Sequence, residues 1–221
     1  MSPEILWLIA KATGQTLHMV GVAALVGSLL GVPLGVFLAT SAKGELFAAP
    51  MANRVIGLVV NAARSTPFII LVVAIIPFTR LIAGTSIGTS AAIVPLTVAT
   101  VPFVARLVEA AVREVDPGLV EAARAMGATP LQIVQKVLLA EALPGLTLAL
   151  TLTLVSLIGY SAMVGAVGGG GLGDLGIRYG YQRFMPDVML AVVVVLIVLV
   201  QVVQSAGDRL ARHFDKRGRR G

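Results

Sequence analysis

Cysteine is absent from this sequence, and charged and aromatic residues are scarce. Without cysteine the chain forms no disulfide and offers no thiolate to a metal or a nucleophilic site. Only 13% of the 221 residues are charged and 5% are aromatic, whereas 57% are hydrophobic and the mean hydropathy is +0.94. Because soluble domains carry about 25% charged residues, this composition excludes a soluble globular protein and predicts an integral membrane protein.

Sequence motifs for catalysis and nucleotide binding are also missing. No Gly-x-x-x-x-Gly-Lys-Ser/Thr stretch occurs, so this chain is not itself a P-loop ATPase. His18 and His213 are isolated from each other and from carboxylate clusters, which argues against a metal site. The stretch "GGGGLG", residues 168–173, matches a GxGxxG pattern but follows an expected membrane helix instead of a strand. We therefore expect a flexible external loop there, and no catalytic residue, metal or cofactor in this chain.

Five stretches are apolar for about twenty residues, the length that a helix needs to cross about 30 Å of hydrocarbon. The last contains "VMLAVVVVLIVLVQVV", which is apolar on every side and so favours a helix over a barrel strand. The sequence predicts an all-α integral membrane fold with five transmembrane helices. The expected spans lie near residues 17–40, 55–78, 91–112, 143–167 and 188–206, within one transmembrane domain at 17–206 that follows an extracytoplasmic segment at 1–16 and precedes a basic tail at 207–221.

Basic residues gather at the C-terminal end, where six of the 17 lysines and arginines fall within residues 209–221. If this tail is cytoplasmic, the cytoplasmic side carries eleven of them and the other side four. The positive-inside rule then predicts an outside N-terminus and an inside C-terminus. A basic tail beside an apolar span indicates a membrane anchor, so no nucleic-acid partner is expected.

A mixed-charge stretch, "EAARAMGATPLQIVQK", separates the third and fourth expected spans on the cytoplasmic side. Asp116 followed by proline is typical of a helix start, and Gly127 suits the left-handed residue that ends a helix. Thr129 with Gln132 predicts a capping box at the start of a second helix. These patterns fit both a solvated connection and two short helices that seat in the cleft of another protein.

Two arginines lie within the expected spans, where an unpaired charge costs several kcal/mol. Arg64 belongs to "ARSTPF", in which Pro67 predicts a kink whose freed backbone groups the preceding serine and threonine can satisfy. Arg106 lies three residues before Glu109 and is expected to pair with it. Either arginine could line a solute pathway, or could reach the membrane surface or tie helices together.

The fourth expected span carries Tyr160, Ser161 and Met163 among aliphatic residues. They either line a translocation pathway or fill packing gaps, and flexible Met163 is the stronger gate candidate. The first span has Gly27, Gly31 and Gly35 in GxxxGxxxG spacing, which predicts close helix packing inside the protein or at a dimer seam.

The segment "EAARAMG" followed by "ATPLQIVQKVLLAEALP" resembles the EAA loop of permease subunits of bacterial ABC importers. Glu121, Ala122, Ala123 and Gly127 match that pattern. Three further blocks resemble the permease subunit of methionine ABC importers: "ARSTPFIILVVAIIPFTRLIAGTSIG", "AAIVPLTVATVPFVARLVEAA" and "LIGYSAMVGAVGGGGLGDLGIRYGY". The chain departs from the family at Ala140, where a proline usually follows leucine, so the second helix is expected to run about one turn further.

The resemblance implies a type I ABC importer permease fold in the bacterial inner membrane, with cytoplasmic coupling helices and alternating access. It implies docking of two ATPase subunits, which bind ATP and Mg²⁺, at Glu121, Ala122, Ala123, Arg124 and Gly127. It also implies a second copy of this chain, an extracytoplasmic substrate-binding protein, and an amino-acid substrate, methionine in its L form and also D. A gradient-driven secondary carrier or small channel is the alternative, although Glu109 is the only carboxylate within an expected span.

Overall fold

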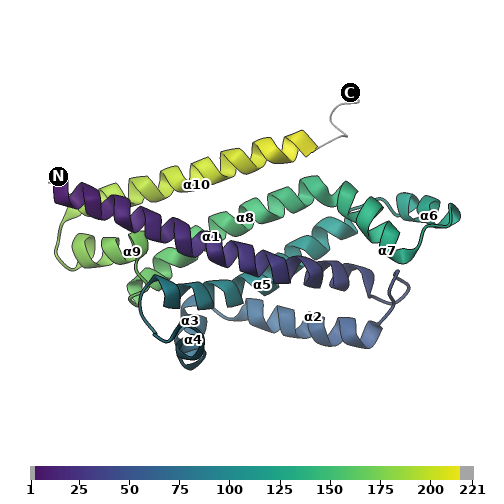
Figure 1. The fold of residues 1–221 in the computed structure, drawn as a ribbon, viewed down its shortest axis with the longest axis horizontal. Helices are drawn as coiled ribbons and strands as arrows, with labels where there is room; N and C mark the ends of the chain where they lie inside the picture. Colours follow the sequence, from purple (N-terminus) through teal and green to yellow (C-terminus); the bar gives the residue numbers. More distant parts are fainter. Residues whose placement is uncertain (1–2, 215–221) are drawn as a thin grey trace.

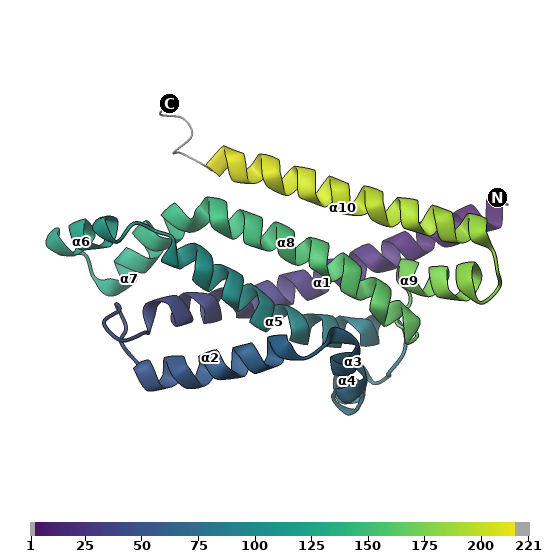
Figure 2. The same cartoon turned by 180° about the vertical axis from the view of Figure 1, so that it is seen from behind.

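The computed structural model describes residues 3–214, which form helices and short connections without a β-strand. Four long helices run along the long axis of an elongated bundle (Figure 1): α1 (Pro3–Thr40), α5 (Thr89–Arg113), α8 (Leu139–Ala166) and α10 (Pro186–Phe214). The start of α1 and the end of α10 lie at opposite ends of the bundle (Figures 1 and 2). This arrangement fits an odd number of membrane spans.

Helix α1 is longer than the sequence predicted, because residues 3–16 continue the first expected span as one helix of 38 residues. At 1.5 Å per residue, this helix is about 57 Å long and extends well beyond about 30 Å of hydrocarbon. The expected segment at 1–16 is therefore, over its described part, the first turns of α1. Its first two residues lie outside the described part of the chain.

The second expected span, 55–78, is not one helix. Helix α2 (Pro50–Ser65) ends before Pro67, and α3 (Phe68–Ala74) starts after a bend of 100°, followed by α4 (Ile76–Ala83). Proline cannot donate a backbone hydrogen bond, and the hydroxyls of Ser65 and Thr66 donate to the carbonyls of Asn61 and Ala62 at 2.9 and 3.3 Å. The predicted kink is present and sharper than expected. If α2 and α3 are counted together as one bent span, the bundle has five spans: this one and the four long helices.

The glycines of α1 pack against α5, which is the intramolecular alternative for the GxxxGxxxG pattern. A methyl group added at Gly31 would lie 2.8 Å from Val104 Cβ, and one at Gly27 or Gly35 would overlap Thr100 or the carbonyl of Ala105. Small residues let two helix backbones approach closely where the hydrophobic effect between helices is absent. The α1–α5 seam is thus part of the fixed core of the bundle.

The segment expected as a flexible external loop is instead packed. Helix α9 (Gly171–Leu175) and the π-helical turn η2 (Gly176–Tyr181) follow α8, at the end of the bundle where α1 begins (Figure 1). The backbone N–H groups of Gly171 and Leu172 donate to Gln15 Oε1 at 3.1 Å and Thr16 Oγ1 at 2.9 Å. These donors are used by α1, so they do not present a phosphate-binding turn.

At the opposite end, α6 (Pro117–Ala125) and α7 (Pro130–Ile133) form the segment between α5 and α8 (Figure 2). A π-helical turn, η1 (Val134–Leu138), joins α7 to α8, and residues 130–166 form one helical stretch. The second helix of the segment was expected to end about one turn further on, but it continues into α8 without a break. Ala140 keeps its backbone N–H, and Pro144 lies inside α8. The expected tail is helical to Phe214, and 215–221 lie outside the described residues.

Candidate functional site

The segment from α6 to α7 has the hydrogen bonds that its sequence predicted. Asp116 Oδ1 accepts from the N–H of Gly118 at 2.8 Å, and Gly127 has a φ of 80°, in the left-handed region. The Thr129 N–H donates to Gln132 Oε1 at 2.9 Å, and the Gln132 N–H donates to Thr129 Oγ1 at 3.4 Å. Two helices and a sharp turn are therefore held by local contacts that need no partner.

The two adjacent alanines of this segment face different ways. Ala123 is 4% exposed and belongs to a cluster with Val115, Ile133 and Val134, whereas Ala122 is exposed. The carbonyl of Ala123 also accepts from the N–H of Ala128 at 3.1 Å, across the turn. Ala123 thus fixes α6 to the bundle, and Ala122 belongs to its outer surface.

Charged and apolar side chains are exposed together around the turn. Glu121 and Arg124 are exposed, Met126 is 82% exposed, and Leu131 is 58% exposed. Large apolar groups rimmed by polar ones are typical of protein–protein contact sites. Met126, the C-cap residue of α6, was not singled out from sequence.

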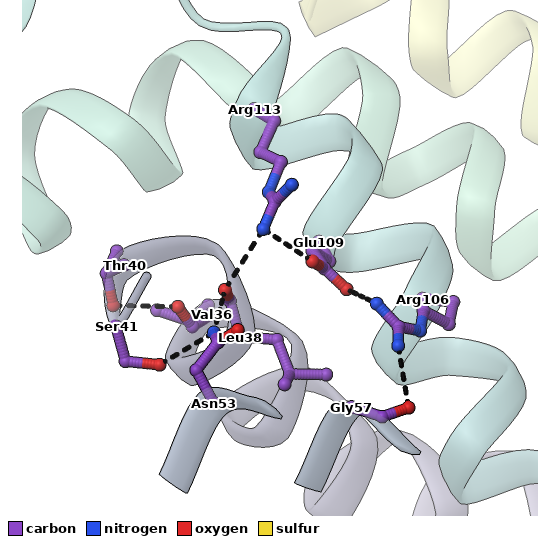
Figure 3. A network of polar contacts seen from close by, with 9 residues as sticks. All are labelled: Val36, Leu38, Thr40, Ser41, Asn53, Gly57, Arg106, Glu109 and Arg113. Atoms are coloured by element: carbon purple, nitrogen blue, oxygen red, sulfur yellow. Dashed lines mark hydrogen bonds and ion pairs between the residues drawn. The ribbon is translucent and has the colours of Figure 1, made fainter. Parts of the chain in front are cut away.

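Arg106 and Glu109 form the expected pair inside a larger polar network (Figure 3). Arg106 Nη1 lies 2.5 Å from Glu109 Oε2, and its Nη2 donates to the carbonyl of Gly57 on α2 at 2.8 Å. Arg113 Nη2 lies 2.8 Å from Glu109 Oε1 and donates to the carbonyl of Leu38 at 3.4 Å. Arg106 is therefore an interhelical tie, one of the two alternatives that its sequence left open.

Asn53 extends this network to the end of α1 (Figure 3). Its Nδ2 donates to the carbonyl of Leu38 at 2.8 Å and to Ser41 Oγ at 3.0 Å. The network joins the cytoplasmic ends expected for α1, α2 and α5, next to the start of α6. Sequence analysis did not identify Asn53, because its partners lie 12 and 15 positions earlier in the chain.

A pocket of about 480 Å³ lies at the break between α2 and α3. Arg64 lines it with its guanidinium carbon 5.9 Å from the ring centre of Phe103. Phe68 and Tyr160 stack in its wall with ring centres 4.5 Å apart, and Met163, 48% exposed, completes the side formed by α8. Four elements, α2, α3, α5 and α8, thus meet around one arginine.

Three of the four pathway candidates are brought together in this pocket, and the fourth is not. Arg64, Tyr160 and Met163 line it, whereas Ser161 is buried and its hydroxyl donates to the carbonyl of Ile158 at 2.7 Å. Ser161 therefore fits the packing alternative. Phe68 and Phe103 were not singled out from sequence, although Pro67 marked the break at which Phe68 follows.

Comparison with known proteins gives consistent matches along most of the chain. Residues 31–220 match the family described as "Binding-protein-dependent transport system inner membrane component". The "Probable D-methionine transport system permease protein MetI" of Vibrio cholerae serotype O1 is 59% identical over 210 residues, 95% of this chain and 93% of the relative. The D-methionine transport system permease protein MetI of Escherichia coli K12 is 54% identical over 165 residues, 75% of this chain and 76% of that protein.

Two solved structures have the same fold. One, described as "Inward facing conformations of the MetNI methionine ABC transporter: CY5 native crystal form", matches with a TM-score of 0.96 and 52% identity over 98% of this chain and 100% of that chain. The other, "Crystal structure of an amino acid ABC transporter with histidines", matches with a TM-score of 0.78 over 95% of each chain. At 20% identity, this second likeness bears on the fold alone.

Proposed function

The chain belongs to the family of binding-protein-dependent transport system inner membrane components, and from this premise we propose that it is the permease subunit of an ATP-driven methionine importer. The relatives named as D-methionine permeases and the likeness to a methionine ABC transporter support this substrate. The chain lacks a P-loop motif, so a separate ATPase supplies the energy. The observation that carries the proposal is the α6–α7 segment.

This segment is suited to dock an ATPase subunit. Its fold is fixed by its own caps and by Ala123, while Glu121, Ala122, Arg124 and Met126 remain exposed at one end of the bundle. Because the segment is rigid, a displacement of a bound ATPase would also move the helices that the segment joins, α5 and α8. Gly127, with its left-handed backbone, sets the angle between the two helices. The proposed docking site comprises Glu121, Ala122, Ala123, Arg124 and Gly127.

A second copy of the chain completes the importer. Five spans make a thin wall for a solute path, and homo-oligomers usually close with two-fold symmetry. Helices α2 to α4 carry a run of exposed large apolar side chains that suits a copy-to-copy face near the pocket. It includes Val55, Leu58, Val59, Ile70, Val73 and Leu81.

Two permeases above two ATPases, with a substrate-binding protein outside, operate by alternating access. The basic tail and the α6–α7 segment are cytoplasmic, and the start of α1 is external. ATP binding brings the ATPases together and moves the docked segments, and the bundle changes from inward-open to outward-open. The permease contributes the path and the moving interface, and no covalent chemistry.

The alternative, a carrier driven by an ion gradient, is disfavoured by the surroundings of Glu109, the only carboxylate within an expected span. A proton- or sodium-coupled carrier uses acidic groups that can release and rebind the ion. Glu109 has one oxygen against Arg106 and the other against Arg113, and its side chain is 8% exposed. A carboxylate held between two arginines is a structural group.

Reconstitution tests the proposal directly. The chain is placed in proteoliposomes alone, with its ATPase, and with both the ATPase and the binding protein, and uptake of labelled methionine and a panel of other amino acids is measured. We expect uptake only with all components and ATP, and strongest for methionine. Uptake by the chain alone, driven by an ion gradient and indifferent to ATP, would contradict the proposal.

A further inference from the structure

We propose that the pocket at the α2–α3 break binds a zwitterionic α-amino acid with an apolar or thioether side chain, and that Arg64 holds its carboxylate. The inference rests on the proposed function and names where the permease itself holds its substrate. It concerns a binding site in the path, in addition to recognition by the binding protein.

The charge of Arg64 has no ion-pair partner among the described residues. Among residues 3–214, ion pairs join Arg106 and Arg113 to Glu109, and Arg178 to Asp174, and none involves Arg64. An ionisable side chain inside a membrane protein that lacks an internal partner indicates a functional site. A ligand anion would supply the missing charge.

The guanidinium of Arg64 lies over the ring of Phe103. Its contact with the face of Phe103, at 5.9 Å, is attractive through the ring quadrupole and leaves the N–H donors free. The serine and threonine that follow Arg64 use their hydroxyl protons on α2 carbonyls, so they do not compete for the pocket. The planar fork of an arginine matches a carboxylate with two parallel hydrogen bonds.

The remaining lining suits the rest of the ligand. The volume of about 480 Å³ lies within the range of about 300–1,000 Å³ found for small-molecule sites. The stacked rings of Phe68 and Tyr160 line the pocket, and a thioether sulfur makes favourable contacts with the edges of such rings. Met163 is flexible enough to fit unbranched side chains of different lengths.

The position of the pocket connects binding to movement. Its wall includes residues on both sides of the 100° bend, and the Phe68–Tyr160 stack joins α3 to α8. A change in the bend or a shift of α8 would therefore alter the distance between Arg64 and the apolar wall. The site is formed in one arrangement of the helices and opened in another, as alternating access requires.

Photolabelling locates the site. The purified complex of permease and ATPase, without the binding protein, is irradiated with a diazirine analogue of methionine, and labelled peptides are identified by mass spectrometry. We expect label on α3 or α8 near the pocket, displaced by methionine but not by methioninol, which lacks the carboxylate. Arg64→Gln should lower this label at least about tenfold, because a charge-assisted contact is lost.

Arg64→Lys keeps the charge without the fork and should retain part of the label. Arg80→Gln, an exposed arginine on α4 that does not line the pocket, is the matched control and should retain all of it. Equal displacement by methionine and methioninol, or undiminished label in Arg64→Gln, overturns the inference. If the wild-type complex imports methionine with ATP but shows no label in the pocket, the pocket inference is wrong and the proposed function stands. If the complex shows no ATP-driven import, the proposed function is wrong.

Discussion

Arg106 and Arg64 lie in neighbouring parts of the same apolar bundle, yet their surroundings differ. Arg106 has a carboxylate on one side and a backbone carbonyl of α2 on the other, and its network continues to the end of α1 (Figure 3). Arg64 has an aromatic ring beneath it and an open pocket in front. The first arginine holds helices together, and the second leaves its charge available to a ligand.

The same contrast separates the α1–α5 core from the α6–α7 segment. Inside the core, Gly27, Gly31 and Gly35 of α1 lie directly against side chains and backbone of α5, and most of the buried side chains are apolar. At the segment, Glu121, Arg124 and Met126 are exposed although the backbone beneath them is well fixed. We expect partners to bind at such exposed groups on a fixed backbone, so substitutions there should affect function more than stability.

The largest expected loss of stability follows Glu109→Ala. The substitution leaves Arg106 partly buried without its carboxylate partner. Removal of one partner of a buried ion pair lowers the free energy of unfolding by about 3–5 kcal/mol. The variant should give low yield and a lowered thermal midpoint, measured by heating followed by size-exclusion chromatography. Glu114→Ala, an exposed carboxylate directly after the last residue of the same helix, is the control and should behave like wild type.

A double variant sharpens this prediction. Arg106→Met combined with Glu109→Leu replaces both charges by apolar groups, and such replacements often recover stability. The double variant should therefore be more stable than Glu109→Ala. If it is less stable, or if Glu109→Ala has a wild-type thermal midpoint, the network does not tie α2 to α5.

Substitutions of the adjacent alanines Ala122 and Ala123 should give the next largest difference in stability. Ala123→Leu places a large side chain in the packed cluster under α6 and should cost about 1–3 kcal/mol, whereas Ala122→Leu points outward. Thermal midpoints should fall for the first variant only, while recovery of the ATPase with the tagged permease should fall for both. Equal stability of the two variants would mean that the segment is not fixed through Ala123.

Arg64→Gln should have the smallest effect on stability, within about 0.5 kcal/mol, because the side chain is exposed to the pocket and has no ion pair among the described residues. Its thermal midpoint should match wild type, while ATP-driven methionine uptake by the complete importer falls. A midpoint as low as that of Glu109→Ala would place Arg64 with the structural arginines.

Local chemistry explains what the sequence could predict. The caps at Asp116 and Thr129, the turn at Gly127 and the break at Pro67 depend on residues within a few positions, and all are present in the structure. The Arg106–Glu109 pair is also local. The glycine pattern predicted close packing, although the partner helix α5 was not identifiable from sequence.

Contacts between distant segments account for what sequence analysis missed. Asn53, Phe103 and the Gln15–Gly171 contact depend on which helices become neighbours. Helix α1 began earlier than expected because its first turns pack on α9 and α10 in spite of their polar residues. Tyr160 and Met163 could not be separated from Ser161, since the face of α8 toward the pocket is set by α2, α3 and α5.

The claim that α6–α7 connects this chain to its energy source is tested most directly by Glu121→Lys beside Glu114→Lys. Both reverse an exposed carboxylate, seven positions apart, and only the first lies on the docking segment. Permease is purified by its own tag from membranes that contain the ATPase, and ATPase recovery and ATP-driven methionine uptake are measured. We predict that Glu121→Lys remains inserted and folded but loses both, while Glu114→Lys keeps both; normal recovery and uptake with Glu121→Lys would contradict the account.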